Sequence, residues 1–273
     1  MDEGPVDEGP VNAPPIALIL AGPNGAGKTT VSSVFVGPDV EFVNADIIGA
    51  ELRRDDPHRP GADVTAGRIV SARLRALTAE RRSFCFETNL ASPGLVGRID
   101  AWCAAGYEVR LVFVSLPNVD LALARVAARV GAGGHDVPEE TVRSRLTAGR
   151  RYFVTLYRHR VDEWAPYDNE AGGSVLIASG DVSDEDVLDV AAWSALRERA
   201  SVPRQRGDGK LCSERSPRHR RPCGPRRQVV TTSRLAAVDA SGGHSCARRT
   251  SRPWSRGRGD ARRQARLAQA GEY

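Results

Sequence analysis

Residues 22–30 read GPNGAGKTT, a glycine-rich turn that follows an apolar stretch and carries the only lysine before Lys210. The turn fits the pattern GxxxxGK[ST], in which successive backbone N–H groups surround a phosphate at the start of a helix. In such a turn Lys28 reaches the outer phosphate oxygens and the Thr29 hydroxyl ligates Mg²⁺. We therefore expect a site for ATP or GTP with Mg²⁺. The residues predicted to bind the nucleotide are Gly22, Pro23, Asn24, Gly25, Ala26, Gly27, Lys28, Thr29 and Thr30.

A bound triphosphate can drive motion, switch a partner or donate a phosphoryl group. The position of Asp46 helps to distinguish among these three uses. It follows the apolar stretch 41–44 by about two residues, at the sheet edge where we also expect the glycine-rich turn. A carboxylate there can accept a hydroxyl proton and orient the oxygen toward the outer phosphate. The same residue could instead cap a helix that starts at Ile47, and the two roles are compatible.

A second acid, Glu87, ends the apolar stretch 83–87 and is expected at the same edge. An acid in this place commonly serves Mg²⁺ or the waters around it, and it could equally hold a substrate. A carboxylate that ends a strand by chance is the alternative.

Eight arginines gather between residues 125 and 160, a density that suits a reaction on phosphate. Phosphoryl transfer needs cations that stabilise the negative charge on the transferred phosphoryl group. The planar guanidinium of arginine can donate two parallel hydrogen bonds to such a group. We expect two or three to be catalytic and the others to be surface residues or partners of Glu139, Glu140 and Asp162. Arg143 and Arg145 point about 200° apart on a helix and should not share a target. The set is Arg125, Arg129, Arg143, Arg145, Arg150, Arg151, Arg158 and Arg160.

Apolar and amphipathic stretches alternate from Ile16 onward, and this alternation predicts the elements that position these side chains. The expected strands are 16–21, 41–44, 83–87, 108–115 and 173–179. The expected helices are 28–35, 47–53, 63–81, 93–106, 119–130 with Asn118 as its cap, one from about 138 with Asp136 as its cap, and a last helix opened by Ser183-Asp184-Glu185-Asp186. This order predicts an α/β three-layer sandwich with a mainly parallel five-stranded sheet. Ligands of such sheets bind beyond the carboxyl ends of the strands.

The composition divides the chain into three regions. Residues 1–15 include the repeat DEGPV-DEGPV and are expected to form a disordered acidic leader, whereas 16–200 form the domain. Residues 201–273 hold 18 Lys and Arg against five Asp and Glu, so the basic pI belongs to this segment. We expect an arginine-rich disordered tail. Binding of RNA or DNA phosphates by this tail is the less favoured alternative.

The five cysteines form no CxxC pair, and those of the tail lack zinc-ligand spacing. The sequence shows no secretory leader and no apolar run near the roughly 20 residues that span a bilayer. These features predict a reduced, cytoplasmic protein without a membrane segment.

Six segments together resemble the zeta toxin family: the glycine-rich turn, FVNAD, FCFETNLAS, AAGYEVRLVFVSLP, GGHDVP and PYDN. They lie between about residues 16 and 179, and their order and spacing are more specific than a P-loop alone. More narrowly, this segment resembles the chromosomal zeta-like P-loop kinases.

The resemblance implies a P-loop NTPase fold like that of nucleoside kinases, with a helical lid, and a kinase that phosphorylates the 3′-hydroxyl of UDP-N-acetylglucosamine. It makes Asp46 the base and assigns ATP contacts to Arg129 and Arg145. The family's Glu-x-Thr substrate motif matches Glu87-Thr88-Asn89 less well. A separate antitoxin protein is the implied partner.

Some assignments stay open at this stage. His135 in GGHDVP could contact phosphate or base, or have no role, and Tyr167-Asp168-Asn169 is a candidate for contact with the nucleotide base. A kinase for another sugar nucleotide or a nucleoside, and an ATPase or switch that acts on protein or nucleic acid, are the alternatives. The chain has no LSGGQ signature of an ABC-type ATPase.

Overall fold

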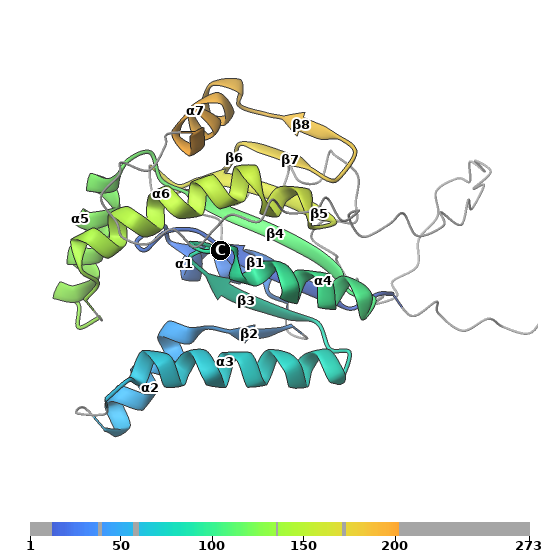
Figure 1. The fold of residues 1–273 in the computed structure, drawn as a ribbon. Coiled ribbons are helices and arrows are strands. Elements are labelled where there is room, and N and C mark those ends of the chain that lie inside the picture. Colours follow the sequence, from blue (N-terminus) through green and yellow to red (C-terminus); the bar gives the residue numbers. More distant parts are fainter. Residues whose placement is uncertain (1–12, 38–39, 57–59, 135, 171–172, 202–273) are drawn as a thin grey trace, which may run out of the picture.

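The computed structural model describes residues 13–37, 40–56, 60–134, 136–170 and 173–201. Nearly all of the expected leader and tail lie outside these residues, as does His135. A single sheet runs through the domain in the order β2-β3-β1-β4-β5-β7-β8, with β6 beside β5 (Figure 1). The parallel part comprises β2 (Glu41–Val43), β3 (Phe84–Thr88), β1 (Ile16–Ala21), β4 (Glu108–Ser115) and β5 (Glu163–Asp168).

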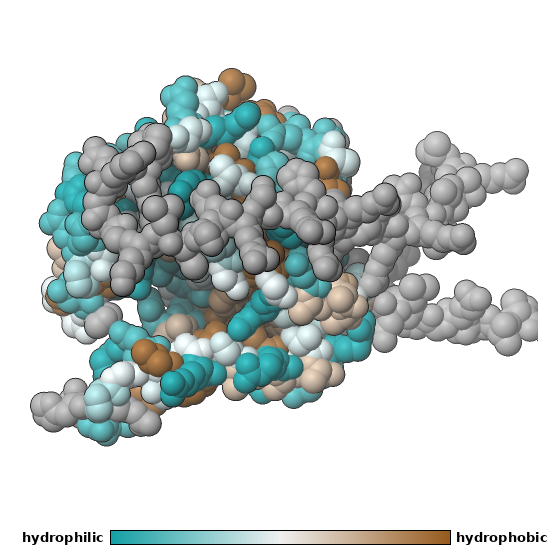
Figure 2. Space-filling view, viewed as in Figure 1, coloured by the Kyte–Doolittle hydropathy of each residue, from teal (hydrophilic) through white to brown (hydrophobic). Residues whose placement is uncertain are grey.

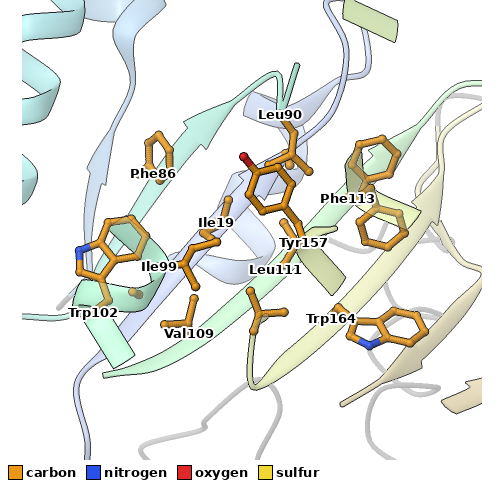
Figure 3. Packing of buried hydrophobic residues seen from close by; sticks show 14 of the residues in the cluster. Ile19, Phe86, Leu90, Ile99, Trp102, Val109, Leu111, Phe113, Tyr157 and Trp164 are labelled. Atoms are coloured by element: carbon orange, nitrogen blue, oxygen red, sulfur yellow. The ribbon is translucent and has the colours of Figure 1, made fainter. Parts of the chain in front are cut away.

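Helices cover both faces of this sheet, as the alternation of elements predicts. In β1, Ala17, Ile19 and Ala21 face one core, while Leu18 and Leu20 face the other. Figure 3 shows the first core, where Ile99 and Trp102 of α4 pack on Ile19 and Phe86 of the sheet. The helices are α1 (Lys28–Phe35), α2 (Ala45–Asp55), α3 (Ala62–Ala79), η1 (Pro93–Leu95), α4 (Val96–Ala104), α5 (Val119–Gly131), α6 (Glu139–Thr155), η2 (Tyr157–His159) and α7 (Val190–Ser201). The predicted three-layer α/β sandwich is confirmed.

Helix α6 passes across the carboxyl ends of the strands from one face to the other. Its first half contributes Val142 and Leu146 to the core shared with α1 and α5. Its second half contributes Phe153 to the opposite core, stacked on Phe113 of β4 with ring centroids 4.6 Å apart. The beginning of α6 is therefore held at the edge of the sheet where the glycine-rich turn lies.

The prediction of the fifth strand is wrong. The fifth parallel strand is β5, whose sequence EWAPYD pairs with β4 from Arg110↔Glu163 to Ser115↔Asp168. A proline and two terminal acids conceal it, because local propensity disfavours these residues in strands. The predicted strand 173–179 instead divides into β6 (Val175–Leu176) and β7 (Ala178–Gly180), which pair antiparallel with β5.

The expected start of the last helix is also wrong, because Ser183-Asp184-Glu185-Asp186 leads into a strand. The Asp181 carboxylate accepts from the backbone N–H groups of Ser183 and Asp184 in a tight turn. Strand β8 (Glu185–Val187) then pairs antiparallel with β7. The helix α7 begins later, where the Asp189 side chain accepts from the N–H of Ala192 at 2.9 Å.

Capping of α5 is as predicted, whereas capping of α6 is not. The Asn118 side chain accepts from the N–H of Leu121 at 2.9 Å. Pro138 occupies the N-cap of α6, and no side chain caps that end. Asp136 lies two residues before this cap position, so it does not cap the helix. None of the helices in the described part of the chain has the length and apolar character that a membrane crossing requires.

Candidate active site

The glycine-rich turn joins β1 to α1 and takes a backbone shape that its glycines permit. Gly25 and Gly27 have φ of 78° and 82°, in the left-handed region that side chains rarely adopt. A Cβ on Gly25 would also lie 2.7 Å from the carbonyl oxygen of Ala122 in α5. Because no side chain caps the start of α1, its first N–H groups are left for a ligand such as phosphate.

Lys28 begins α1 and is buried against the turn. Its ammonium donates to the carbonyl oxygens of Gly22 and Pro23, both at 3.0 Å, and lies 3.4 Å from Oε1 of Glu87. Burial lowers the pKa of Lys28, and the carboxylates of Glu87 and Asp46 oppose this effect. The Lys28 ammonium thus lies in a largely desolvated place beside two carboxylates, at the turn where a phosphate would bind.

Glu87 joins three elements at the edge of the sheet. Its Oε2 accepts from the Thr29 hydroxyl at 3.3 Å and from the Asn44 side-chain amide at 2.7 Å. The parallel register that pairs Leu20 with Glu87 brings the carboxylate to the base of the glycine-rich turn. The expected proximity of Glu87 to Lys28 and Thr29 is therefore present.

Asn44, and not Asp46, caps α2. The Asn44 Oδ1 accepts from the N–H groups of Asp46 and Ile47, at 2.7 and 3.4 Å. The capping interpretation of Asp46 is therefore wrong, because this residue already lies in the first helical turn. Its carboxylate is exposed and faces the space beside Lys28. Asn44 was missed, although an asparagine placed directly before a helix is a standard capping signal.

A cavity of about 430 Å³ opens between the glycine-rich turn, α2 and α5. Figure 2 shows the surface hollowed on this side, above α2. Cations and acids face each other across it, and Ile47 and Ala50 add an apolar wall. The lining residues are Asn24, Gly25, Gly27, Lys28, Thr29, Thr30, Asn44, Asp46, Ile47, Ala50, Glu87, Arg125 and Arg129.

Three of the eight arginines reach this site. Arg125 and Arg129 line the cavity from α5, and Arg125 also donates to the carbonyl oxygen of Glu170 at 3.0 Å. Arg145 of α6 donates to the Asn24 side-chain oxygen of the glycine-rich turn at 3.1 Å. Arg143 points away and pairs with Glu139 on the helix surface, so the expectation that it does not share a target with Arg145 is confirmed.

The remaining arginines hold the fold together. Arg150 is buried in α6 and donates to the carbonyl oxygen of Leu116 just beyond β4, and burial lowers its pKa to about 10. Other contacts tie the end of α6 and the following turn to their neighbours. These are Arg158 with Glu185 at 2.6 Å and Arg160 with Asp100 at 3.6 Å, whereas Arg151 lies over the ring of the adjacent Tyr152 within α6.

The segment Tyr167-Asp168-Asn169 at the end of β5 contacts the glycine-rich turn. The Asn169 amide donates to the carbonyl oxygen of Ala26 at 2.8 Å, and Tyr167 packs edge-on against Phe35 of α1. Thr88 is half-buried, and its hydroxyl accepts from the N–H of Leu90 at 3.2 Å. Thr88 is not among the residues that line the cavity.

The side chains at the cavity wall fit the expected Mg²⁺. Thr29 and Glu87 present a hydroxyl and a carboxylate 3.3 Å apart beside the glycine-rich turn. Mg²⁺ takes oxygen ligands and usually keeps waters and substrate phosphates in its shell, so two protein ligands suffice. Among the described residues no group of three or more His, Cys, Asp and Glu side chains could hold a metal.

Comparison with known proteins places the chain in a family. Residues 18–154, half of the chain, match the AAA_33 family model, described as an AAA domain. The chain belongs to this AAA domain family. The matched part of this AAA domain protein runs from β1 to α6 and contains Lys28, Asp46, Glu87, Arg129 and Arg145.

One relative and several solved structures are similar to this chain. An uncharacterized protein of Haemophilus influenzae is 28% identical over 129 residues, which are 47% of this chain and 91% of that protein. The AvrRxo1-ORF1:AvrRxo1-ORF2 structure with sulphate ions is 14% identical, with a TM-score of 0.57 over 71% of this chain and 66% of that chain, just under two thirds. The same complex with ATP is 16% identical, with a TM-score of 0.55 over 72% and 67% of the two chains. The PezAT toxin-antitoxin structure from Streptococcus pneumoniae is 18% identical over 67% and 77%, and its TM-score of 0.49 is too low to carry an inference.

Proposed function

We propose that this AAA domain protein is an ATP-dependent kinase that phosphorylates a hydroxyl group of a small molecule. The observation that carries the proposal is one shared cavity: Asp46 on α2 faces the same space as Lys28 and Thr29 at the start of α1. A triphosphate on the glycine-rich turn and an acceptor beside α2 would meet there. The AvrRxo1 structure with ATP, which shares the fold, supports ATP as the donor.

Each charged side chain has a role in this proposal. Asp46 accepts the proton of the acceptor hydroxyl. The hydroxyl oxygen bonds to the γ-phosphorus of ATP, and the bond from that phosphorus to ADP breaks. Lys28 lies against the outer phosphate oxygens, and Arg129 and Arg145 offset the charge that develops on the moving group. Thr29 and Glu87 would hold Mg²⁺, which neutralises phosphate charge when bound.

The identity of the acceptor rests on the resemblance to the zeta toxin family, which points to the 3′-hydroxyl of UDP-N-acetylglucosamine. In that proposal Asp46, Glu87 and Thr88 are the substrate-binding residues. The Thr88 hydroxyl accepts from the N–H of Leu90 and keeps its own O–H to donate to a substrate. A separate antitoxin partner is proposed on the same ground, with the two-protein AvrRxo1 complex as support.

Incubation with ATP, Mg²⁺ and a panel of sugar nucleotides and nucleosides tests this function. Mass spectrometry should detect a gain of one phosphate on UDP-N-acetylglucosamine. Phosphorylation of another acceptor alone would keep the kinase and overturn the substrate. ATP turnover without any acceptor, stimulated by protein or nucleic acid, would favour a switch instead.

Two variants test the assignment of the base. Asp46→Asn should leave ATP binding nearly unchanged and reduce transfer by at least about 100-fold, because proton acceptance in the transition state is lost. Lys28→Ala should weaken both binding and transfer, and serves as the comparison. Transfer at the wild-type rate by Asp46→Asn would show that another group is the base.

A further inference from the structure

We infer that Asn44 is a positioning residue, which fixes the Glu87 carboxylate and the first turn of α2 as one unit at the cavity wall. The inference deepens the proposed function, because this unit joins the helix that carries Asp46 to the side chains that would hold Mg²⁺. Asn44 itself acts through its neighbours.

The sheet places Asn44 beside Glu87. Strands β2 and β3 are parallel, and their last registered pair is Val43↔Phe86. Asn44 and Glu87 are the next residues along the two segments, so their side chains meet where β2 ends beside β3. Asn44 is 5% exposed and the Glu87 side chain is 9% exposed. The contact is therefore largely shielded from water.

Hydrogen-bond chemistry determines how the amide must be oriented. The Asn44 Oδ1 faces two backbone N–H donors at the start of α2, so the Nδ2 group points to Glu87. A carboxylate accepts and does not donate, which makes the opposite orientation of the amide unfavourable. An asparagine supplies an acceptor and a donor on one rigid plane. Serine can cap the helix through its hydroxyl, but its shorter side chain has no second polar atom to direct at Glu87.

The amide holds the carboxylate in a particular direction. Oε1 of Glu87 lies 3.4 Å from the Lys28 ammonium, and Oε2 lies between Thr29 and Asn44. Without the Asn44 donor, the carboxylate is free to turn both oxygens toward Lys28 and away from Thr29. Asn44 should thus strengthen the binding of Mg²⁺ with nucleotide while it sets the place of Asp46.

The experiment compares Asn44→Ser with Asn118→Ser in the full chain. Both asparagines cap helices through their side-chain oxygens, and serine caps nearly as well. The readout is the Mg²⁺ concentration that gives half-maximal binding of a fluorescent ATP analogue. Asn44→Ser should raise it by about 10-fold or more, the usual effect of losing a group that orients a metal ligand. Asn118→Ser should leave it unchanged, and thermal unfolding should confirm that both variants fold.

A double variant tests whether Asn44 acts through Glu87. In a chain that carries Glu87→Gln, Asn44→Ser should change the Mg²⁺ requirement by less than about threefold, because the carboxylate that Asn44 orients is already gone. An unchanged requirement in the single variant Asn44→Ser, or an equal loss in both backgrounds, would overturn the inference. Nucleotide binding without any Mg²⁺ dependence in the wild type would overturn it too.

These outcomes are separate from the test of the kinase, since the binding assay contains no acceptor. Suppose that the wild type binds Mg²⁺ and nucleotide, that Asn44→Ser weakens this binding, and that no acceptor is phosphorylated. The positioning role of Asn44 would then stand and the proposed kinase activity would be refuted.

Discussion

Replacement of Glu87 by glutamine should destabilise the folded protein, because it breaks a buried ion pair. The Lys28 ammonium lies 3.4 Å from Glu87, and the two side chains are 7% and 9% exposed. A glutamine amide would direct its N–H₂ group either at this ammonium or at the Asn44 amide, and both are donors. The variant cannot replace the contacts that it removes.

The size of the loss follows from the partners that remain. Removing one member of a buried pair typically costs about 3–5 kcal/mol. Lys28 keeps two carbonyl acceptors at 3.0 Å and borders an open cavity, which lowers the expected loss of unfolding free energy to about 2–3 kcal/mol. For a domain of this size each kcal/mol corresponds to about 2–4 °C, so the Tm should fall by about 4–12 °C.

The loss should also depend on pH with a definite sign. Burial already lowers the Lys28 pKa from 10.5, and the Glu87 carboxylate opposes this effect, so glutamine should lower it further. When the pKa of a lysine is lower in the folded than in the unfolded protein, the full loss of unfolding free energy is present at pH values below the folded-state pKa. The cost declines as pH rises above that value and ends above the unfolded value. The difference from wild type should therefore shrink as the buffer approaches pH 10.

Urea and thermal unfolding monitored by circular dichroism, at neutral and alkaline pH, measure this effect. The matched control is Glu139→Gln, whose pair with Arg143 is exposed at 61% and 46%. Such surface pairs contribute about 0–1 kcal/mol, so the control should unfold like the wild type. A Glu87→Gln variant as stable as wild type, or more stable, would refute the idea that Glu87 stabilises Lys28 in the free protein.

Two further predictions concern the arginines and the buried thiol. Arg145→Ala should slow phosphoryl transfer by about 100-fold, as loss of one transition-state donor does, whereas Arg143→Ala should change it less than about twofold; equal effects would exclude a special role for Arg145. Burial raises the pKa of Cys85 to about 12, so at pH 8 only about one thiol in 10,000 is ionised. Iodoacetamide should then leave the peptide that contains Cys85 unmodified in the native protein and alkylate it in urea, and rapid native alkylation would show that this part of the sheet opens.

The parts of the site that were predictable have local signals or follow from one simple geometric rule. The glycine-rich turn is recognisable because its backbone needs positive φ angles, which favour glycine, and because a lysine follows at the start of a helix. Few other residue types can occupy these positions. Asp46 and Glu87 could be placed together because parallel strands end at the same edge. Arg145 was a weaker expectation, and its contact with Asn24 spans 121 residues of sequence.

Other features were hidden because their stability comes from distant partners. Strand β5 reads poorly as a strand by itself, yet β4 on one side and the short strands β6 and β7 on the other give it hydrogen bonds. Glu185 lies in a strand despite its acidic surroundings, since Arg158 and Trp193 bond to its carboxylate at 2.6 and 2.9 Å. Sequence periodicity contains no information on these contacts.

The sequence by itself determined the phosphate-binding turn, the alternation of strands and helices, and the sheet edge at which the acids gather, because each depends on neighbours along the chain or on the common direction of the strands. Tertiary structure alone decided that α6 crosses the carboxyl ends of the strands and that the Asn44 amide connects α2 to Glu87. Both depend on packing and strand register between segments far apart in the chain. The chemistry expected at Lys28 and Asp46 and the sheet edge they share thus follow from the sequence, whereas the contacts that hold their side chains in place depend on the fold.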